Sequence, residues 1–364
     1  LSAAGGAITI ADLVRAGRIT ASARSIDITS SGGLFFDKAT ATAGGLSIST
    51  AQTLTVNGDS SATGNVSLSS AAGLAYHGTL TSGGTTQLTA VGGPLSVASL
   101  TSAGSVSAIG RSIDISSPGS LTFDGAAATA GDLSLTTLDF TATGPLSATG
   151  VVAITGTNGI SLGTLTSGGT TALTASSGAI LAGDIHSVGA VSATGQSVSL
   201  GSTIALNLGS VNATAGNLTV TALDVTGTGA LSASGNAAID SAGGIALGLL
   251  SSGGTTRLTA DGAIALTDLR SVGLVNAVGG SLDIGSGAGL SFGNARATAG
   301  DLRIATHGDL AFVGATATGA VNLSTTSGSI GEAPTGGVIS GGNLSLVAPG
   351  GIMLPAARSG GTTL

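Results

Sequence analysis

The feature that most constrains this chain is an internal repeat with a period of about 85 residues. The segment Ser-Gly-Gly-Thr-Thr-x-Leu-Thr-Ala begins at Ser82, Ser167 and Ser252, so its copies are evenly spaced. A second segment, Ala-Thr-Ala-Gly, begins at positions 41, 128, 213 and 297. A third segment, which reads Ser-Ile-Asp-Ile in its first two copies, begins at positions 25, 112, 197 and 281. Three separate markers with one period predict a repeat architecture.

Each large repeat divides into shorter segments with a strand-like pattern. In one repeat these are 131–150, 151–169, 170–189 and the longer 190–215. Their alignment gives two apolar columns, which contain Leu133, Val152, Thr171 and Val191, and Leu135, Ile154, Leu173 and Ala193. Residues that alternate with a period of two point to one face of a strand. A segment of about 20 residues buries that face only by stacking on a neighbour, so each segment is predicted to be one coil of a β-helix.

The predicted fold is therefore an all-β, right-handed parallel β-helix, or β-solenoid. Right-handedness follows the general preference of parallel crossover connections. We expect one solenoid domain over residues 1–364, with about 17 coils of about 20 residues and a length on the order of 80 Å, at about 4.8 Å per coil. The chain is expected to be a fragment of a longer protein. The super-repeats are expected at about 1–43 (partial), 44–130, 131–215, 216–299 and 300–364 (partial).

Two details refine this prediction. Phe36, Phe123, Leu208 and Phe292 occupy one place in the repeat, eight residues before the Gly of Ala-Thr-Ala-Gly. Being four coils apart, they are not expected to stack on one another, and we expect them to fill the wider last coil of each repeat. The last marker copy, at Ser359, follows Ser252 by more than one repeat period. The excess is close to one coil, which predicts an extra coil around residues 321–342.

Composition supports the all-β prediction and excludes several classes of protein. The chain has 64 Gly and 42% hydrophobic residues, but only 2% aromatic and 7% charged residues. Disorder combines low hydrophobicity with high charge, and collagen requires Gly at every third position. The net charge is −7 and the basic residues are scattered, which argues against nucleic-acid binding.

The sequence says less about where the chain acts. It has no Cys, which suits a cytosolic protein and equally suits a chain that crosses an outer membrane unfolded. It contains no apolar run long enough for a membrane-spanning helix, and its first residues show no signal peptide. Neither end reads as a cap, so we expect the polypeptide or an assembly to continue in both directions.

The coil pattern resembles a known family. Segments such as Gly131 to Thr136, which reads Gly-x-Leu-x-Leu-Thr, and the shorter Gly159 to Leu162 are similar to the haemagglutinin repeats of two-partner-secreted exoproteins of the filamentous haemagglutinin type. The resemblance covers nearly the whole chain. It implies a right-handed parallel β-helix that an outer-membrane secretion barrel exports, and a role in adhesion, biofilm formation or toxin delivery at the bacterial cell surface. The Asn-Pro-Asn-Gly motif of the family's secretion module does not occur here, so an autotransporter passenger remains an open alternative.

Few residues suggest chemistry, and we expect no catalytic, cofactor-binding or metal-binding residues. The three histidines, His77, His186 and His307, fall at different coil positions. Asp184 and His186 could share one strand face, which provides two possible metal ligands where zinc needs three or four. We therefore favour a solvated pair on a turn.

An acidic column offers a second candidate. Asp27, Asp114 and Asp283 recur at one repeat position, with Ser199 in the remaining copy. They are expected four coils apart, which is too far to share a calcium ion. We interpret them as outward-facing residues that keep the strands soluble.

Three functional hypotheses follow. The first is a structural shaft of a secreted bacterial surface adhesin, which would contact host or neighbouring-cell receptors or glycans. The second is a self-assembling extracellular filament, through contacts between copies at open solenoid ends. The third is a polysaccharide-active enzyme, which needs paired carboxylates, whereas the chain has one Glu, Glu332, and one Lys, Lys38. An ice-binding surface would need Thr-x-Thr in every coil, and such pairs occur only at positions such as 40 and 42, 141 and 143, and 316 and 318.

Overall fold

A computed structural model describes residues 1–14 and 17–364, without the side chains of residues 332–336. Arg15, one of the scattered basic residues, lies outside the described residues. The described chain contains β-strands, which pair in parallel, and no helix. The prediction of an all-β parallel β-solenoid is confirmed.

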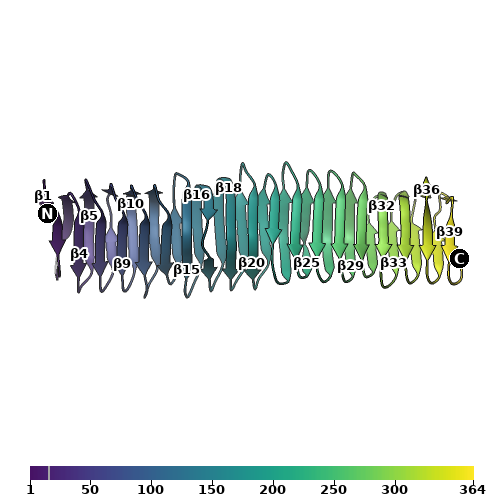
Figure 1. Ribbon diagram of the computed structural model, residues 1–364, viewed down its shortest axis with the longest axis horizontal. Helices are drawn as coiled ribbons and strands as arrows, with labels where there is room; N and C mark the ends of the chain where they lie inside the picture. The colour runs from purple at the N-terminus through teal and green to yellow at the C-terminus, as the bar shows by residue number, and fades with distance from the viewer. Residues whose placement is uncertain (15–16) are drawn as a thin grey trace. The chain divides into compact units, whose positions relative to one another are not determined.

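The chain divides into two compact units. Unit 1 comprises Leu1–Ala182 and Ser187–Gly189, and unit 2 comprises Gly183–His186 and Ala190–Leu364. Figure 1 shows that strands within each unit follow one another in chain order. Strand β20 (Ile180–Ser187) is divided between the units.

The strands of unit 1 are β1 (Ser2–Ala3), β2 (Ile8–Ile10), β3 (Arg18–Ala23), β4 (Ile26–Ser30), β5 (Leu34–Ala41), β6 (Leu46–Thr50), β7 (Leu54–Val56), β8 (Ser60–Ala62), β9 (Val66–Ser70), β10 (Leu74–Ser82), β11 (Thr86–Ala90), β12 (Leu95–Ser102), β13 (Val106–Gly110), β14 (Ile113–Ser116), β15 (Leu121–Ala128), β16 (Leu133–Ala142), β17 (Leu146–Ala148), β18 (Val152–Ser167) and β19 (Thr171–Ala175).

The strands of unit 2 are β21 (Val191–Gly195), β22 (Val198–Gly201), β23 (Leu206–Ala213), β24 (Leu218–Ala222), β25 (Val225–Ala233), β26 (Ala237–Ser241), β27 (Ile245–Ser252), β28 (Thr256–Ala260), β29 (Ile264–Ser271), β30 (Val275–Gly279), β31 (Leu282–Ser286), β32 (Leu290–Ala297), β33 (Leu302–Thr306), β34 (Leu310–Ala317), β35 (Val321–Thr325), β36 (Ile330–Ser340), β37 (Leu344–Val347), β38 (Ile352–Met353) and β39 (Ala357–Ser359).

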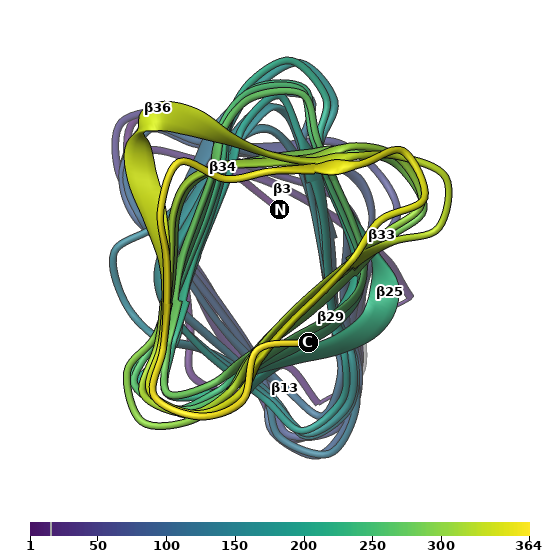
Figure 2. The same cartoon turned by 90° about the vertical axis from the view of Figure 1, so that its right-hand side faces the viewer.

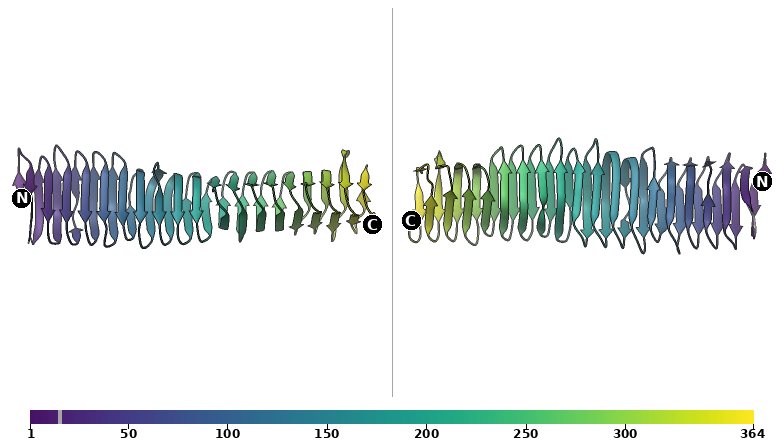
Figure 3. Two further views of the ribbon diagram at one scale, coloured as in Figure 1. Left: turned by 60° about the horizontal axis from the view of Figure 1, so that its bottom comes forward. Right: turned by 180° about the vertical axis from the view of Figure 1, so that it is seen from behind.

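A coil consists of three short strand segments joined by corners. In unit 1, β6, β7 and β8 make one coil, and β9 then begins the next coil by stacking on β6, with Leu46 opposite Val66. Seen end-on, the coils close around an interior (Figure 2). In the two further views the strands lie edge to edge, with turns along both margins (Figure 3). Some long strands, such as β10 and β25, contain a register shift and supply two of the three segments.

Columns of apolar side chains fill the interior. Burial alternates along each strand, as in β4, because successive side chains point to opposite faces. In unit 1, parallel ladders stack the buried residues Leu34, Leu54, Leu74, Leu95, Ile113, Leu133, Val152 and Thr171. In unit 2, they stack Val225, Ile245, Ile264, Leu282, Leu302, Val321 and Leu344. The predicted neighbours Leu133, Val152 and Thr171, and likewise Leu135, Ile154 and Leu173, are confirmed.

The expected wide coil over 190–215 is wrong. Ala193 of β21 lies opposite Val211 of β23, so the next coil begins well before this segment ends. The segment is therefore one ordinary coil plus one further strand. Counting residues between markers could not reveal this, because the three sides of a coil share one apolar pattern.

One large repeat is consequently four coils and one strand, or four and one-third turns. In unit 1, Ser82 stacks on Ala62 and below Ser102, whereas Ser167 lies in the column of Ala90, four coils above it. In unit 2, Ala297 likewise lies in the column of Ala222 and not in that of Ala213. Equivalent positions in successive repeats therefore lie on successive sides of the solenoid.

The Phe column marks a register shift. Phe36, Phe123, Leu208 and Phe292 are all buried, and each is the last paired residue before its strand skips one or two residues relative to the preceding coil. Because no wide coil exists, these side chains instead fill the corner where the bulge occurs. Phe123 stacks on Phe140 of the next coil, with ring centroids 5.5 Å apart, and not on another member of its column.

The extra coil expected near residues 321–342 is present. Gly279 lies one coil above Ala260, and the same column continues through Ala297, Ala317 and Ser340 to Ser359, which is five coils above Ala260. The marker at Ser167 is only four coils above Ala90.

Candidate functional site

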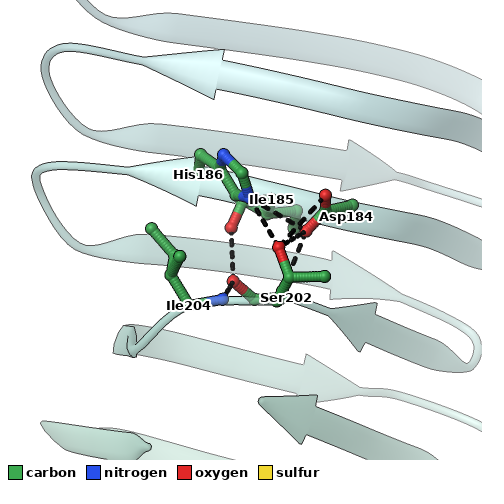
Figure 4. Close-up of polar contacts among 6 residues, drawn as sticks. Asp184, Ile185, His186, Ser202 and Ile204 are labelled. Carbon is green, nitrogen blue, oxygen red and sulfur yellow. Dashed lines mark hydrogen bonds and ion pairs between the residues drawn. The ribbon is translucent and has the colours of Figure 1, made fainter. Parts of the chain in front are cut away.

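A polar cluster on unit 2 joins two of the residues that the sequence singled out. Asp184 and His186 lie on β20, and Oδ1 of Asp184 is 3.1 Å from Nε2 of His186 (Figure 4). Thr203, on the following coil, completes the cluster. Its backbone N–H and its hydroxyl donate to Oδ1 of Asp184 over 2.9 and 3.1 Å, and its Oγ1 is 2.9 Å from His186 Nε2.

The surroundings of the cluster also hold the corner in place. The hydroxyl of Ser202 donates to the carbonyl oxygen of Ile185 over 2.7 Å and accepts the backbone N–H of Ile204 (Figure 4). The hydrogen bond from the Thr203 backbone is the main cause that lowers the pKa of Asp184, and His186 adds a smaller effect. The cluster therefore binds one coil to the next.

The geometry of the cluster is unlike that of a nucleophilic triad. In a Ser-His-Asp triad, the imidazole contacts the acid through one nitrogen and the nucleophile through the other. Here Nε2 of His186 meets both Asp184 and Thr203. Within the described part of the chain, no three His, Cys, Asp or Glu side chains gather in a way that could hold a metal ion.

The other histidines lie apart from this cluster. His307 Nδ1 is 2.7 Å from the hydroxyl of Thr326, on the following coil. His77 is on β10 of unit 1. The structure thus brings Asp184 and His186 together, as the sequence suggested, but joins neither of them to another histidine. The expected position on a turn is wrong, because both residues lie within strand β20.

The acidic column faces outwards, as the sequence predicted. Asp27, Asp114 and Asp283 are exposed, and Ser199 is half-buried. Asp283 pairs with Arg303, which is opposite it on the next coil, at 3.2 Å. Such exposed pairs contribute roughly 0–1 kcal/mol to stability. The acidic residues of the column are therefore separate surface residues, each on its own strand.

A ladder of Asp and Asn side chains at the corners is a recurrent polar feature, and the sequence analysis missed it. In each case, the side-chain oxygen accepts the backbone N–H of a residue one coil later, at 2.7 to 3.0 Å. The acceptors are Asp12, Asp59, Asn65, Asp132, Asp184, Asn217, Asp224, Asn236, Asp268, Asp301, Asp309 and Asn343. A Gly followed by Asn or Asp and an apolar residue, as at Gly64-Asn65-Val66 and Gly216-Asn217-Leu218, is the sequence signal that could have found it.

The three repeat markers are themselves used in contacts between coils. The Thr of every Ala-Thr-Ala-Gly copy, namely Thr42, Thr129, Thr214 and Thr298, donates to a carbonyl oxygen of the preceding coil. The Gly of that marker lies against the first Ser of the third marker, as at Gly44 and Ser25, where an added Cβ would come within 3.1 Å.

The Ser-Gly-Gly-Thr-Thr marker also makes contacts between coils, through its buried Ser and its buried second Thr. The hydroxyls of Ser82, Ser167 and Ser252 donate to carbonyl oxygens at the corner. The second Thr of each copy, at Thr86, Thr171 and Thr256, is buried and shares a hydrogen bond with the Ser of the next coil. At Gly84 and Gly254, an added Cβ would overlap the Oδ1 of a ladder Asn, so a larger residue there would displace that Asn side chain.

Open depressions occur on the surface of both units. One of about 550 Å³ on unit 2 is lined by Ala, Gly, Leu and Thr residues together with Asp283 and Arg303. Another, of about 370 Å³ on unit 1, is lined by Gly17, Arg18, Phe35 and Asn57. Of the residues considered for an enzyme, Lys38 is exposed on β5, and the side chain of Glu332 lies outside the described residues.

Comparison with known proteins gives little more. Residues 195–249, on unit 2, match a family model described as repeats of unknown function (DUF5649). No curated protein and no solved structure matches the chain. Across residues 1–14 and 17–364, there is no helix of sufficient length and apolarity to cross a membrane.

Proposed function

We propose that this chain is a structural shaft segment of a secreted bacterial surface adhesin of the filamentous haemagglutinin type. In this role it would hold an adhesive or effector region away from the cell. An outer-membrane secretion barrel would export it, and its partners would be receptors or glycans on host or neighbouring cells.

The observation that carries this proposal is the use of the repeated residues. A repeated binding function would present the recurring side chains to a ligand, whereas here the markers donate to carbonyl oxygens of neighbouring coils or pack against them. The residues that recur in the sequence are therefore those that stack one coil on the next. In a solenoid, such nearest-neighbour contacts set length and stiffness.

Deletion of one whole repeat tests this function. Removal of residues 131–215 joins Ala130 to Gly216 and so restores the Ala-Thr-Ala-Gly marker that begins at Ala128. The deletion removes four and one-third coils, and a shaft should shorten by about 21 Å at about 4.8 Å per coil. Electron microscopy and small-angle X-ray scattering of the purified chains would measure the difference.

A matched variant separates length from folding. Leu173 is buried in β19, and Leu173→Pro removes a ladder hydrogen bond and should disrupt its coil. Particles that do not shorten after the repeat deletion would contradict the shaft function. Continuous fibres of the unmodified chain, seen together with high oligomers in native mass spectrometry, would favour the alternative of a self-assembling extracellular filament.

A further inference from the structure

One aromatic side chain does not take part in the core. The chain has six Phe and one Tyr. Six of these seven rings are buried, namely Phe36, Tyr76, Phe123, Phe140, Phe292 and Phe312. Phe35 is half-buried and points to the opposite side of β5 from Phe36. The core therefore does not explain why an aromatic residue is at position 35.

Polar groups surround the outward ring of Phe35. The guanidinium carbon of Arg18, on the preceding coil, lies 5.7 Å from the ring centroid. Nε of Arg18 donates to Oδ1 of Asp37 over 2.7 Å, which orients the guanidinium. Arg18, Phe35, Asn57 and Gly17 line the depression of about 370 Å³. Its volume is at the low end of the roughly 300–1,000 Å³ that small-molecule sites occupy.

The other repeats provide an internal control for this surface. The residues that precede Phe123, Leu208 and Phe292, and so correspond to Phe35, are Thr122, Asn207 and Ser291. Three of the four copies of the repeat therefore form the same coil with a small or polar residue at this position. Phe35 departs from this pattern, and packing of the core does not require an aromatic residue there. Such a departure indicates a binding site added to the repeated scaffold.

The chemistry of these groups defines a ligand class. An aromatic face packs against the apolar C–H face of a ring and prefers defined geometries. Because Nε of Arg18 is used by Asp37, the terminal nitrogens of Arg18 and the amide of Asn57 remain as donors, and the second oxygen of Asp37 as an acceptor. Among the described residues of this site, the charged side chains are the Arg18–Asp37 pair, which has no net charge and so favours an uncharged ligand with adjacent donors and acceptors.

We propose that Phe35, Arg18, Asp37 and Asn57 form a binding site for a neutral pyranose saccharide, which stacks on Phe35 and shares its vicinal hydroxyls with the three polar side chains. This site rests on the proposed function and deepens it, because it places one class of glycan on the flank of the solenoid.

Saturation-transfer difference NMR and calorimetry with the whole chain test the site. The probes are methyl α-mannoside, methyl β-galactoside and methyl β-glucoside, with methyl β-glucuronide as the charged comparison. At least one neutral glycoside should bind, and Phe35→Ala should weaken it by about fivefold, given the typical strength of aromatic contacts. Asn57→Ala, a change at an exposed residue, should also weaken binding. Thr122→Ala, at the corresponding position of the next repeat, should leave it unchanged.

Each outcome decides the proposal. No binding of any neutral glycoside at tens of millimolar would overturn it, and so would equal binding by wild type, Phe35→Ala and Asn57→Ala. Stronger binding of the glucuronide would overturn the neutral ligand class. Unchanged far-UV circular dichroism and thermal midpoint of Asn57→Ala ensure that lost binding is not lost folding. These results are separate from the length measured after repeat deletion, so either proposal can fail alone.

Discussion

Substitution of Asn236 measures what one rung of the corner ladder contributes. Oδ1 of Asn236 accepts two hydrogen bonds from Thr255, from its backbone N–H at 2.8 Å and from its hydroxyl at 3.0 Å. A net hydrogen bond contributes about 0.5–1.5 kcal/mol. Because Asn236 is exposed, the lower half of that range applies, and Asn236→Ala should destabilise the corner by about 1–2 kcal/mol.

Hydrogen exchange is the suitable assay, because solenoids open locally and a single unfolding free energy is poorly defined for them. A loss of about 1–2 kcal/mol corresponds to a roughly 5- to 30-fold faster exchange through local opening. The effect should centre on β26 and β28, whose strands pair in register. Amides of unit 1 should keep their rates, because each coil contacts only its neighbours.

Two further variants make the experiment decisive. Asn236→Asp keeps an acceptor in the same place and should retain most of the protection. Asn276→Ala changes an exposed Asn of β30 and should have little effect. The reasoning is refuted if Asn236→Ala exchanges no faster than Asn276→Ala, or if the Asp variant is as damaged as the Ala variant.

Three other predictions test the core, the corners and the Asp184 cluster. Phe36→Ala, which empties a fully buried site, should cost about 3–5 kcal/mol, whereas Phe35→Ala on the opposite face should cost less than about 1 kcal/mol; hydrogen exchange of the amides of β5 and of the strands that pair with it, β3 and β7, compares them. Gly144→Ala would push a Cβ into the backbone oxygen of Asp124 and should destabilise by about 1–3 kcal/mol, while Gly163→Ala has open space and should be neutral or stabilising; a lower thermal midpoint for both would contradict this. Because the pKa of Asp184 is lowered in the folded chain, its contribution to stability is present above the unfolded value of 3.8 and is lost as pH falls through the folded pKa. Asp184→Asn should therefore flatten the acid side of the stability profile, and a carboxyl NMR titration that finds the pKa of Asp184 at or above 3.8 would disprove the sign.

The sequence was sufficient for the fold class and for much of the core. The alternation around Leu133, Leu135, Val152 and Ile154 predicted both the strands and their stacking, because only one face of each strand is buried. The proximity of Asp184 and His186 was also predictable, since residues two apart on a strand share a face.

The sequence was insufficient wherever one coil depends on the next. Thr203 joins the Asp184 cluster from the following coil, and nothing local to Asp184 indicates it. The Asn236 rung was missed for the same reason, although the preceding Gly235 gives a recognisable pattern. The wide coil was wrong because residue counts give the length of a repeat but not the number of sides that it passes, which only the pairing of Ala193 with Val211 reveals.

The one-third turn left over in each repeat has a consequence for multivalent recognition. In each unit, neighbouring repeats present equivalent surfaces to directions about a third of a turn apart. A flat opposing surface, such as another cell, that contacts a feature of one repeat would therefore not contact the equivalent feature of the next repeat in the same unit, about 21 Å along the solenoid. A bivalent antibody against one repeat would gain little avidity from the next repeat, because its second arm would have to reach around the solenoid to bind the equivalent epitope. Duplication of a repeat thus lengthens such a protein and at the same time changes the direction in which everything beyond it faces.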